Sequence, residues 1–401
     1  MCLGIPSGVT LYIRALLSSD PRRARCTLLL SQAIRNLEIT ANFSQGKHLV
    51  ATAVVYFHPA RSAESMRKAV ICGVLAWLYS AFISISSMWI SVLFDTQLDV
   101  PKVGHAIIVV VFCGGGLGFI GFVKEKMKDP LVGVSCSLTS IAIITVLTKE
   151  NAIIDGVFTN DKVVQVMKEV AIGAMISLSI NYLALAAQLP KPKPPPHDHA
   201  PPELASESEQ DPELQPLLGK PPKPRFYKRD DVRYGMKVGI GAALWAMFAF
   251  IPETRPTYQH WRGEWGLVSY MLVCSNSISA SRDVGLQRLV GTLLGAALSV
   301  VAWYISGGEP ISLASLGCVA VTFCFWIMLK KNLPPFGRFT VLTYNVSVLY
   351  AYSLSIRDSQ DDEDEGGVNP DILSIVYHRC IIVGGGCIWG ILITNLIFAK
   401  D

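Results

Sequence analysis

Charged residues are scarce in this chain. Only 16% of its 401 residues are Asp, Glu, Lys or Arg, 51% are hydrophobic, and the mean hydropathy is +0.40. A soluble domain usually carries about 25% charged residues. The deficit argues against an ordinary soluble protein and favours a membrane protein with several spans. The net charge of +4 is modest, so we expect no nucleic-acid partner.

Motifs of catalytic and metal sites are also missing. The sequence holds no GxSxG, no HExxH and no pair of carboxylates inside an apolar run. Its ten cysteines form no CxxC pair and no Cys/His cluster with metal-ligand spacing. Most lie in or beside apolar runs, where they serve as small packing residues. We therefore predict a protein that is not an enzyme, binds no metal and uses no cofactor.

Apolar runs of helix length recur along the chain. Helices of about twenty apolar residues cross a ~30 Å hydrocarbon layer. We expect helical spans at 67–93, 104–123, 131–148, 165–188, 236–251, 265–281, 288–306, 311–329, 338–355 and 373–398. The predicted fold class is an all-α, polytopic integral membrane protein with about ten helices.

Two parts of the sequence look alike. Residues 61–67 and 282–288 each place two arginines six residues apart before a helix-length apolar run. The last run of each part also carries a cation near its start, Lys168 in one and Arg379 in the other. We predict two parallel helix repeats related by an axis along the membrane normal, as in many transporters. Two more helices before Arg61 would complete the first repeat.

These features divide the chain into four predicted parts. They are an irregular N-terminal segment (1–47), a first transmembrane repeat that looks incomplete (48–189), a linker (190–233) and a second repeat (234–401). If successive spans cross the membrane in alternating directions, every basic cluster lies on the same side of it. The positive-inside bias predicts that this side is cytosolic. The linker and the C-terminus are then cytosolic, and the acidic stretch 358–365 is luminal or external.

The linker has its own composition. It is rich in proline and charge, cannot bury a core, and is expected to be extended and disordered. Within it Glu213, Leu217 and Leu218 fit an acidic dileucine sorting signal, which would recruit sorting adaptors. A plain linker is the alternative interpretation.

The segment SRDVGLQRLVGTLLGA, residues 281–296, carries a family resemblance. It resembles the R-x-x-G-T-x-x-G signature of the fusaric acid resistance and aromatic acid exporter superfamily, with Arg288, Gly291, Thr292 and Gly295 at the matching positions. Plant aluminium-activated malate transporters carry a similar segment. Residues 57–67 are similar to the fungal branch described as endoplasmic-reticulum transporters related to brefeldin A sensitivity.

The resemblance implies a membrane carrier or channel for small organic anions, often aromatic ones. Export or sequestration would take place at the endoplasmic reticulum, the vacuole or the plasma membrane, and the chain could form a homo-oligomer. The alternative is a non-transporting scaffold, or a truncated family member, whose linker recruits sorting partners. Related fungal proteins continue into a cytosolic domain after the last span.

Basic groups at helix ends are the expected lining of the anion path. An ionisable group within a membrane span is costly and usually faces a cavity or a partner. A histidine there would also suit a proton-coupled cycle. Anchoring at the membrane interface is the alternative role. The candidates for the substrate path are Arg67, Arg282, Arg288, Gly291, Thr292, Gly295, His378 and Arg379.

Overall fold

The computed structural model describes residues 63–149, 158, 161–186, 229–331, 333–356 and 371–398. All regular elements in these ranges are helical. The predictions for the N-terminal segment, for Arg61, for most of the linker with its Glu213, Leu217 and Leu218 motif, and for the acidic stretch lie outside the described residues.

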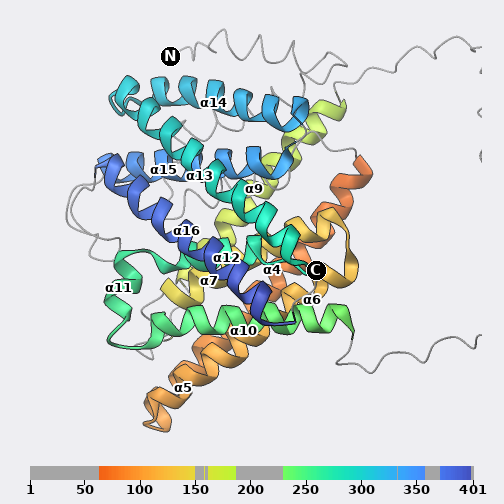
Figure 1. Ribbon diagram of the computed structural model, residues 1–401, viewed down its shortest axis with the longest axis vertical. Helices are drawn as coiled ribbons and strands as arrows, with labels where there is room; N and C mark the ends of the chain where they lie inside the picture. The colour runs from red at the N-terminus through yellow and green to blue at the C-terminus, as the bar shows by residue number, and fades with distance from the viewer. Residues whose placement is uncertain are drawn as a thin grey trace, which may run out of the picture.

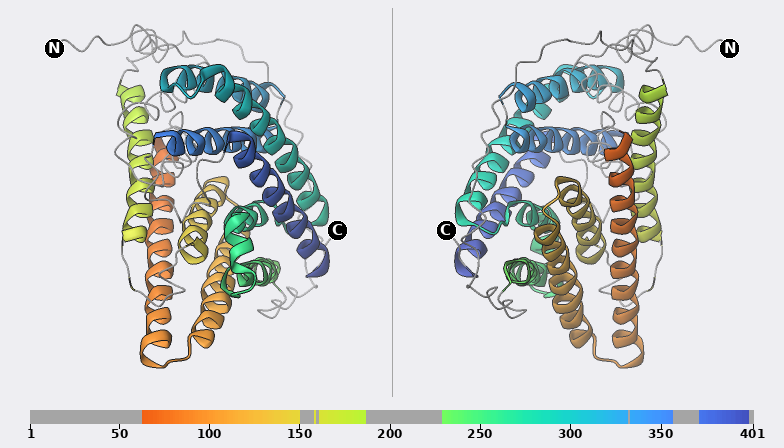
Figure 2. Two further views of the ribbon diagram at one scale, coloured as in Figure 1. Left: turned by 90° about the vertical axis from the view of Figure 1, so that its left-hand side faces the viewer. Right: turned by 90° about the vertical axis from the view of Figure 1, so that its right-hand side faces the viewer.

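The first part of the chain folds into long upright helices. In Figure 2, α4 and the helix formed by α5, η3 and α6 make a hairpin, with α9 beside α4. The π-helical stretches η2 and η3 interrupt the regular α-helical pattern. The elements are α4 (Ala63–Val92), η2 (Leu93–Gln97), α5 (Pro101–Ile107), η3 (Ile108–Gly116), α6 (Leu117–Met127), α7 (Pro130–Lys149) and α9 (Asp161–Ala186).

The second part packs around the first. Helix α10 crosses α6, while α13 and α16 run side by side (Figures 1 and 2). These two helices are antiparallel, because Ser281 meets Thr394 at one end (Oγ–Oγ1 3.0 Å) and Tyr304 meets Asp371 at the other (3.5 Å). The elements are α10 (Asp230–Phe250), α11 (Arg255–His260), α12 (Gly263–Val273), α13 (Ile278–Ser306), α14 (Pro310–Lys330), α15 (Pro334–Ile356) and α16 (Ile372–Leu396).

Five helical stretches of the described ranges are long and apolar enough to cross a membrane. The ten spans and the parallel repeats predicted above stay predictions. The two arginines aligned in those repeats differ in environment, because Arg288 is buried and Arg67 is exposed. The five stretches are Glu64–Gln97, Pro101–Met127, Leu131–Thr148, Ile278–Ser306 and Ile372–Leu396.

The prediction of one continuous helix over 265–281 is wrong. Helix α12 ends at Val273, and α13 begins at Ile278. The Ser281 hydroxyl donates to Val273 O (2.9 Å) and accepts from Ser275 N (3.0 Å), while the Ser277 side chain caps α13 by accepting from Ala280 N. Side chains therefore satisfy backbone groups that a continuous helix would have paired internally.

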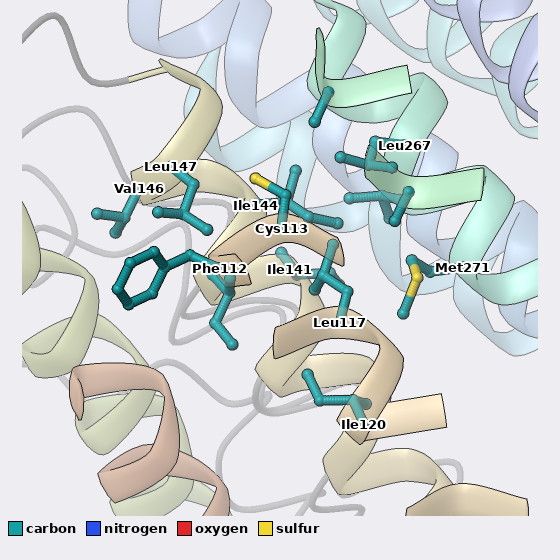
Figure 3. Packing of buried hydrophobic residues seen from close by; sticks show 14 of the residues in the cluster. Phe112, Cys113, Leu117, Ile120, Ile141, Ile144, Val146, Leu147, Leu267 and Met271 are labelled. Carbon is teal, nitrogen blue, oxygen red and sulfur yellow. The ribbon is translucent and has the colours of Figure 1, made fainter. Parts of the chain in front are cut away.

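One hydrophobic core joins the two parts of the chain. Figure 3 shows its centre, where Leu117 and Ile144 from the first part meet Leu267 and Met271 of α12. Glycines bring helices close at its edges. A Cβ on Gly118 would lie 2.9 Å from the Gly235 carbonyl oxygen of α10. The glycine-rich faces thus allow the close helix approach expected of small residues in membrane bundles.

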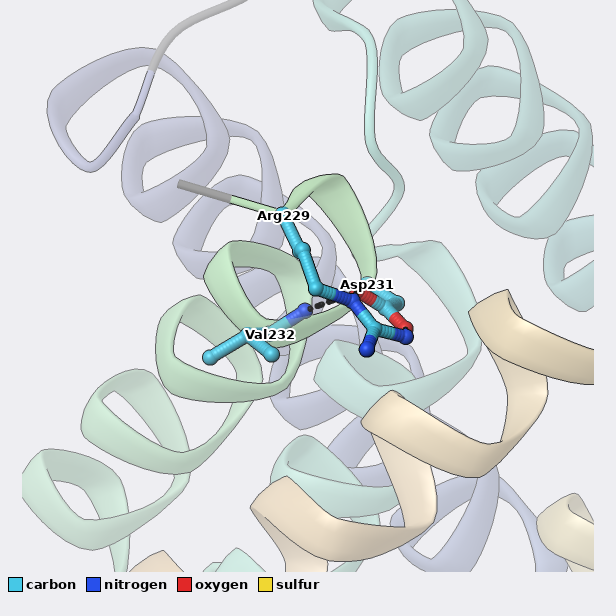
Figure 4. A network of polar contacts seen from close by, with 3 residues as sticks. All are labelled: Arg229, Asp231 and Val232. Atoms are coloured by element: carbon cyan, nitrogen blue, oxygen red, sulfur yellow. Dashed lines mark hydrogen bonds and ion pairs between the residues drawn. The ribbon is translucent and has the colours of Figure 1, made fainter. Parts of the chain in front are cut away.

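A charged pair marks the start of α10 (Figure 4). The Arg229 guanidinium donates to both carboxylate oxygens of Asp231, at 3.1 and 2.5 Å, and Asp231 also accepts from Val232 N. A carboxylate in the first turn is stabilised by the free amides and dipole of the helix N-terminus. The ion pair lowers the pKa of Asp231.

Candidate functional site

A cavity of about 100 Å³ lies where the α11–α12 turn meets α15 and the first three turns of α16. Its wall combines cations with aromatic rings. The cations are Arg262 and Arg379, and two histidines, His260 and His378, lie in the same wall. The rings are those of Trp261, Trp265 and Tyr350. This combination suits an anion that also carries a flat apolar surface.

Arg262 is held in an unusual backbone conformation. It precedes α12 with φ 55° and ψ 58°, in the left-handed region, which costs a residue with a side chain about 1–2 kcal/mol. Its guanidinium carbon lies 4.2 Å from the Tyr350 ring centre and it donates to the Tyr350 hydroxyl. Such strain persists where the surroundings fix it, often at functional positions.

Arg379 enters the same cavity from α16. Its side chain is only 8% exposed, and its guanidinium carbon lies 4.3 Å from the Trp265 ring centre. Close packing of α16 on α12 fixes this distance, since a Cβ on Gly386 would collide with the Gly266 backbone. Arg262, Arg288 and the carboxylate of Glu264 all act electrostatically on Arg379. Cations therefore outnumber carboxylates around this group.

The two histidines form one edge of the cavity. His260 Nε2 lies 3.3 Å from His378 Nε2, and His378 Nδ1 lies 2.8 Å from the Ser374 carbonyl oxygen. The Trp261 ring packs on His378 at 4.8 Å between centres. His260 is exposed and His378 is half-buried. No group of three or more metal-binding side chains occurs among the residues that the structure describes.

Arg288, from the predicted signature, lies deeper in the protein. It is 2% exposed, donates to Ser269 Oγ at 3.5 Å, and stacks over Phe339 with 4.8 Å to the ring centre. Ser269 lies one turn beyond Trp265 on α12. Arg288 is therefore next to the cavity without being part of its wall.

The signature glycines hold α13 against α15. A Cβ on Gly291 would lie 3.0 Å from Phe336 O, and one on Gly295 would lie 2.5 Å from Thr340 O. Thr292, between them, is 1% exposed. The two glycines thus allow α13 to pack closely on α15, which carries the Phe339 ring beside Arg288.

The structure does not gather the predicted cations at one entrance. His378 and Arg379 line the cavity, but Arg67 and Arg282 are exposed elsewhere. Because α13 and α16 are antiparallel, Arg282 lies at the Thr394 end of α16, fifteen residues from Arg379. At 1.5 Å per residue this is roughly 20 Å along the helix.

Among the residues of the cavity wall, sequence reasoning named only His378 and Arg379 as site candidates. His260, Trp261, Arg262 and Trp265 are close in sequence, and this density of cations and rings next to an apolar run was an available signal. Tyr350 carried no such signal. Its role depends on the contact with Arg262, 88 residues earlier in the chain.

A comparison with protein-family models matches the second part of the chain. Residues 242–393 match the family described as fusaric acid resistance protein-like. The matched range contains Arg288 and the whole cavity wall. The match supports the superfamily inferred from the signature and, with the apolar helices, a transporter-like integral membrane protein. No curated protein and no solved structure matches the chain.

Proposed function

We propose that this protein moves small organic anions, including aromatic carboxylates, across a membrane, and that the Arg262–Arg379 cavity is a binding site on their path. The observation that carries the proposal is the pairing of two guanidinium groups with two aromatic rings, Trp265 and Tyr350, in one small cavity. The match to the fusaric acid resistance protein-like family supports it.

The chemistry of the wall favours a carboxylate. A guanidinium presents a planar set of donors that binds both oxygens of a carboxylate at once. Arg262 and Arg379 each lie over an aromatic ring in this wall, so a ligand here would meet both positive charge and the flat apolar surface of a ring. Glu264 offsets only part of the positive charge.

The size of the cavity limits what it holds. Its volume of about 100 Å³ is several times the roughly 10–15 Å³ that a single water needs on the same measure. The cavity therefore has room for a small group such as a carboxylate. We infer that the site holds the anionic end of a solute, while the remainder extends out past His260.

The path continues along one face of α12. Arg262 immediately precedes this helix, and Trp265 and Ser269 within it are four residues apart, the spacing that puts side chains on one side of a helix. They contact Tyr350, Arg379 and Arg288 in that order. Arg288 is thus the next cation along this face, about one helical turn from the cavity.

The predicted orientation is part of this proposal. With the linker and the C-terminus in the cytosol, the start of α16 and the cavity face the lumen or the exterior. Cytosolic anions would then reach Arg288 before Arg379. The membrane would be that of the endoplasmic reticulum, the vacuole or the cell surface.

Tracer flux tests the proposal. The full chain is reconstituted in lipid vesicles, and the efflux of labelled benzoate is compared with that of benzamide, its neutral analogue. We expect benzoate efflux that Arg379→Gln reduces at least tenfold, while the exposed Arg282→Gln control keeps it. Benzoate efflux no faster than from protein-free vesicles would refute the proposal.

A further inference from the structure

The His260–His378 contact has a defined proton arrangement. His378 Nδ1 lies 2.8 Å from a carbonyl oxygen, that of Ser374, and such an oxygen only accepts hydrogen bonds. Neutral His378 therefore carries its single proton on Nδ1 and offers a lone pair at Nε2. The neighbouring Nε2 of His260, at 3.3 Å, must then be the donor.

This arrangement leaves one place for a further proton. Neutral His260 uses its proton on Nε2, so its Nδ1 is open. A proton added there leaves both hydrogen bonds intact and places a positive charge on an exposed ring. A second added proton would have to go to His378 Nε2, where two N–H groups would oppose each other. The pair therefore accommodates one extra proton.

A carboxylate in the cavity would change the charge next to the pair. Bound between Arg262 and Arg379, it would place a negative charge beside the two histidines, and a nearby negative charge favours the positively charged form of an imidazole. The charged and titratable groups that share the cavity wall with the pair are Arg262, just before α12, Tyr350 of α15 and Arg379 of α16, and Tyr377 of α16 contacts His378. Glu264 of α12 and Arg288 of α13 act on Arg379.

We propose that the His260–His378 pair takes up one proton when a carboxylate binds in the Arg262–Arg379 cavity, so that the anion and the proton bind together. The inference rests on the proposed function, because it requires anion binding at this cavity. By thermodynamic linkage, lower pH then tightens anion binding, by about tenfold per pH unit at most. The proton enters at His260 Nδ1 from the exposed side and leaves by the same route when the anion departs.

Calorimetry tests the proton count. Benzoate is titrated into the full chain in lipid nanodiscs at pH values between about 6 and 8, in two buffers with different ionisation enthalpies. The difference in observed heat gives the protons taken up per benzoate. In the wild-type protein we expect an uptake that approaches one proton per bound benzoate. We expect it to fall close to zero in His260→Gln and in His378→Gln, while His105→Gln, a histidine of α5, keeps the wild-type value.

The outcomes separate the two proposals. Benzoate that binds wild type with the same heat in both buffers would overturn the proton coupling and leave the proposed function standing. Uptake that persists unchanged in both cavity-histidine variants would also overturn it. A wild-type protein that binds no benzoate would contradict the proposed function, and the coupling with it.

Discussion

Arg379 of α16 lies against Trp265 of α12, with 4.3 Å between the guanidinium carbon and the ring centre. The contact joins α16, a helix long enough to cross a membrane, to α12, a shorter helix that ends at Val273. Cation–π pairs contribute about 0.5–2 kcal/mol, depending on exposure. Here the pair also holds a cation and a ring side by side in one cavity, as an aromatic carboxylate requires.

Trp265→Leu should reduce the preference for aromatic anions. Removing the ring leaves both guanidinium groups but takes away the flat surface that a ligand ring would contact. Ring–ring contacts contribute about 0.5–1.5 kcal/mol beyond area burial, so the ratio of benzoate to cyclohexanecarboxylate affinity should fall about twofold to tenfold. Calorimetry on nanodiscs measures both affinities on the same protein. Their ratio does not change if part of the variant protein is unfolded, so a fall in the ratio reports on the site itself.

The control for that prediction is Trp326→Leu. Trp326 is 41% exposed on α14, away from the cavity wall, and its loss should leave the affinity ratio unchanged. A ratio that stays at the wild-type value in Trp265→Leu would remove Trp265 from the binding site.

Arg288→Ala should reduce benzoate flux without preventing membrane insertion. The residue is buried beside Ser269 on the proposed path, so an exported anion would lose the cationic contact that it makes before the cavity. A charged hydrogen bond contributes about 1.5–3 kcal/mol, which corresponds to roughly tenfold or more in flux. Vesicle efflux measures the rate. The truncation to alanine also leaves a cavity, so Arg288→Met, which removes the charge but keeps most of the side-chain volume, is the matched control. Wild-type flux in both variants would exclude Arg288 from the path.

Gly386→Ala should destabilise the bundle. A methyl group there would collide with the Gly266 backbone and push α16 away from α12. Overpacking of this kind costs about 1–3 kcal/mol. Thermal unfolding in detergent should show a lower midpoint. Gly133→Ala is the matched control, since nothing lies within 4 Å of its Cβ position, and alanine there should be neutral or stabilising by up to about 1 kcal/mol.

The ion pair at the start of α10 predicts a pH effect. Because Arg229 and the Val232 amide lower the pKa of Asp231, the pair stabilises the folded state above the unfolded pKa of about 3.9 and loses this effect as the pH falls further. The acid-induced loss of stability should therefore be smaller in Asp231→Asn than in wild type. Denaturation followed between about pH 5 and pH 3 measures it. Asp283→Asn, on the exposed face of α13, should behave as wild type, and identical curves for all three would contradict the assignment.

The sequence predicted helix positions well where apolar runs end in charge or proline. The run 311–329 corresponds to α14 (Pro310–Lys330), and 131–148 corresponds to α7 (Pro130–Lys149). Hydrocarbon thickness and helix rise together set these lengths. The break after Val273 was missed because apolar residues flank it on both sides. Its signal was Ser275-Asn276-Ser277, a run of residues that favour helix caps.

The candidate site was only partly predictable. Arg379 stood out because a charge within an apolar run needs a partner. Its distance from Arg282 depends on the antiparallel packing of α13 and α16, and its contact with Trp265 joins residues 114 positions apart, which no local pattern encodes. The signature residues lie on α13, whereas the Arg262–Arg379 cavity is formed by the α11–α12 turn, α15 and α16, elements that the signature does not include.

Equilibrium binding of benzoate tests the central claim most directly. The full chain in nanodiscs is compared with an Arg262→Gln/Arg379→Gln double variant and with an Arg67→Gln/Arg282→Gln double variant of exposed arginines. The account predicts that wild type and the second variant bind benzoate with equal affinity and do not bind benzamide, while the first variant loses benzoate binding. Equal binding of benzoate by all three proteins would contradict it.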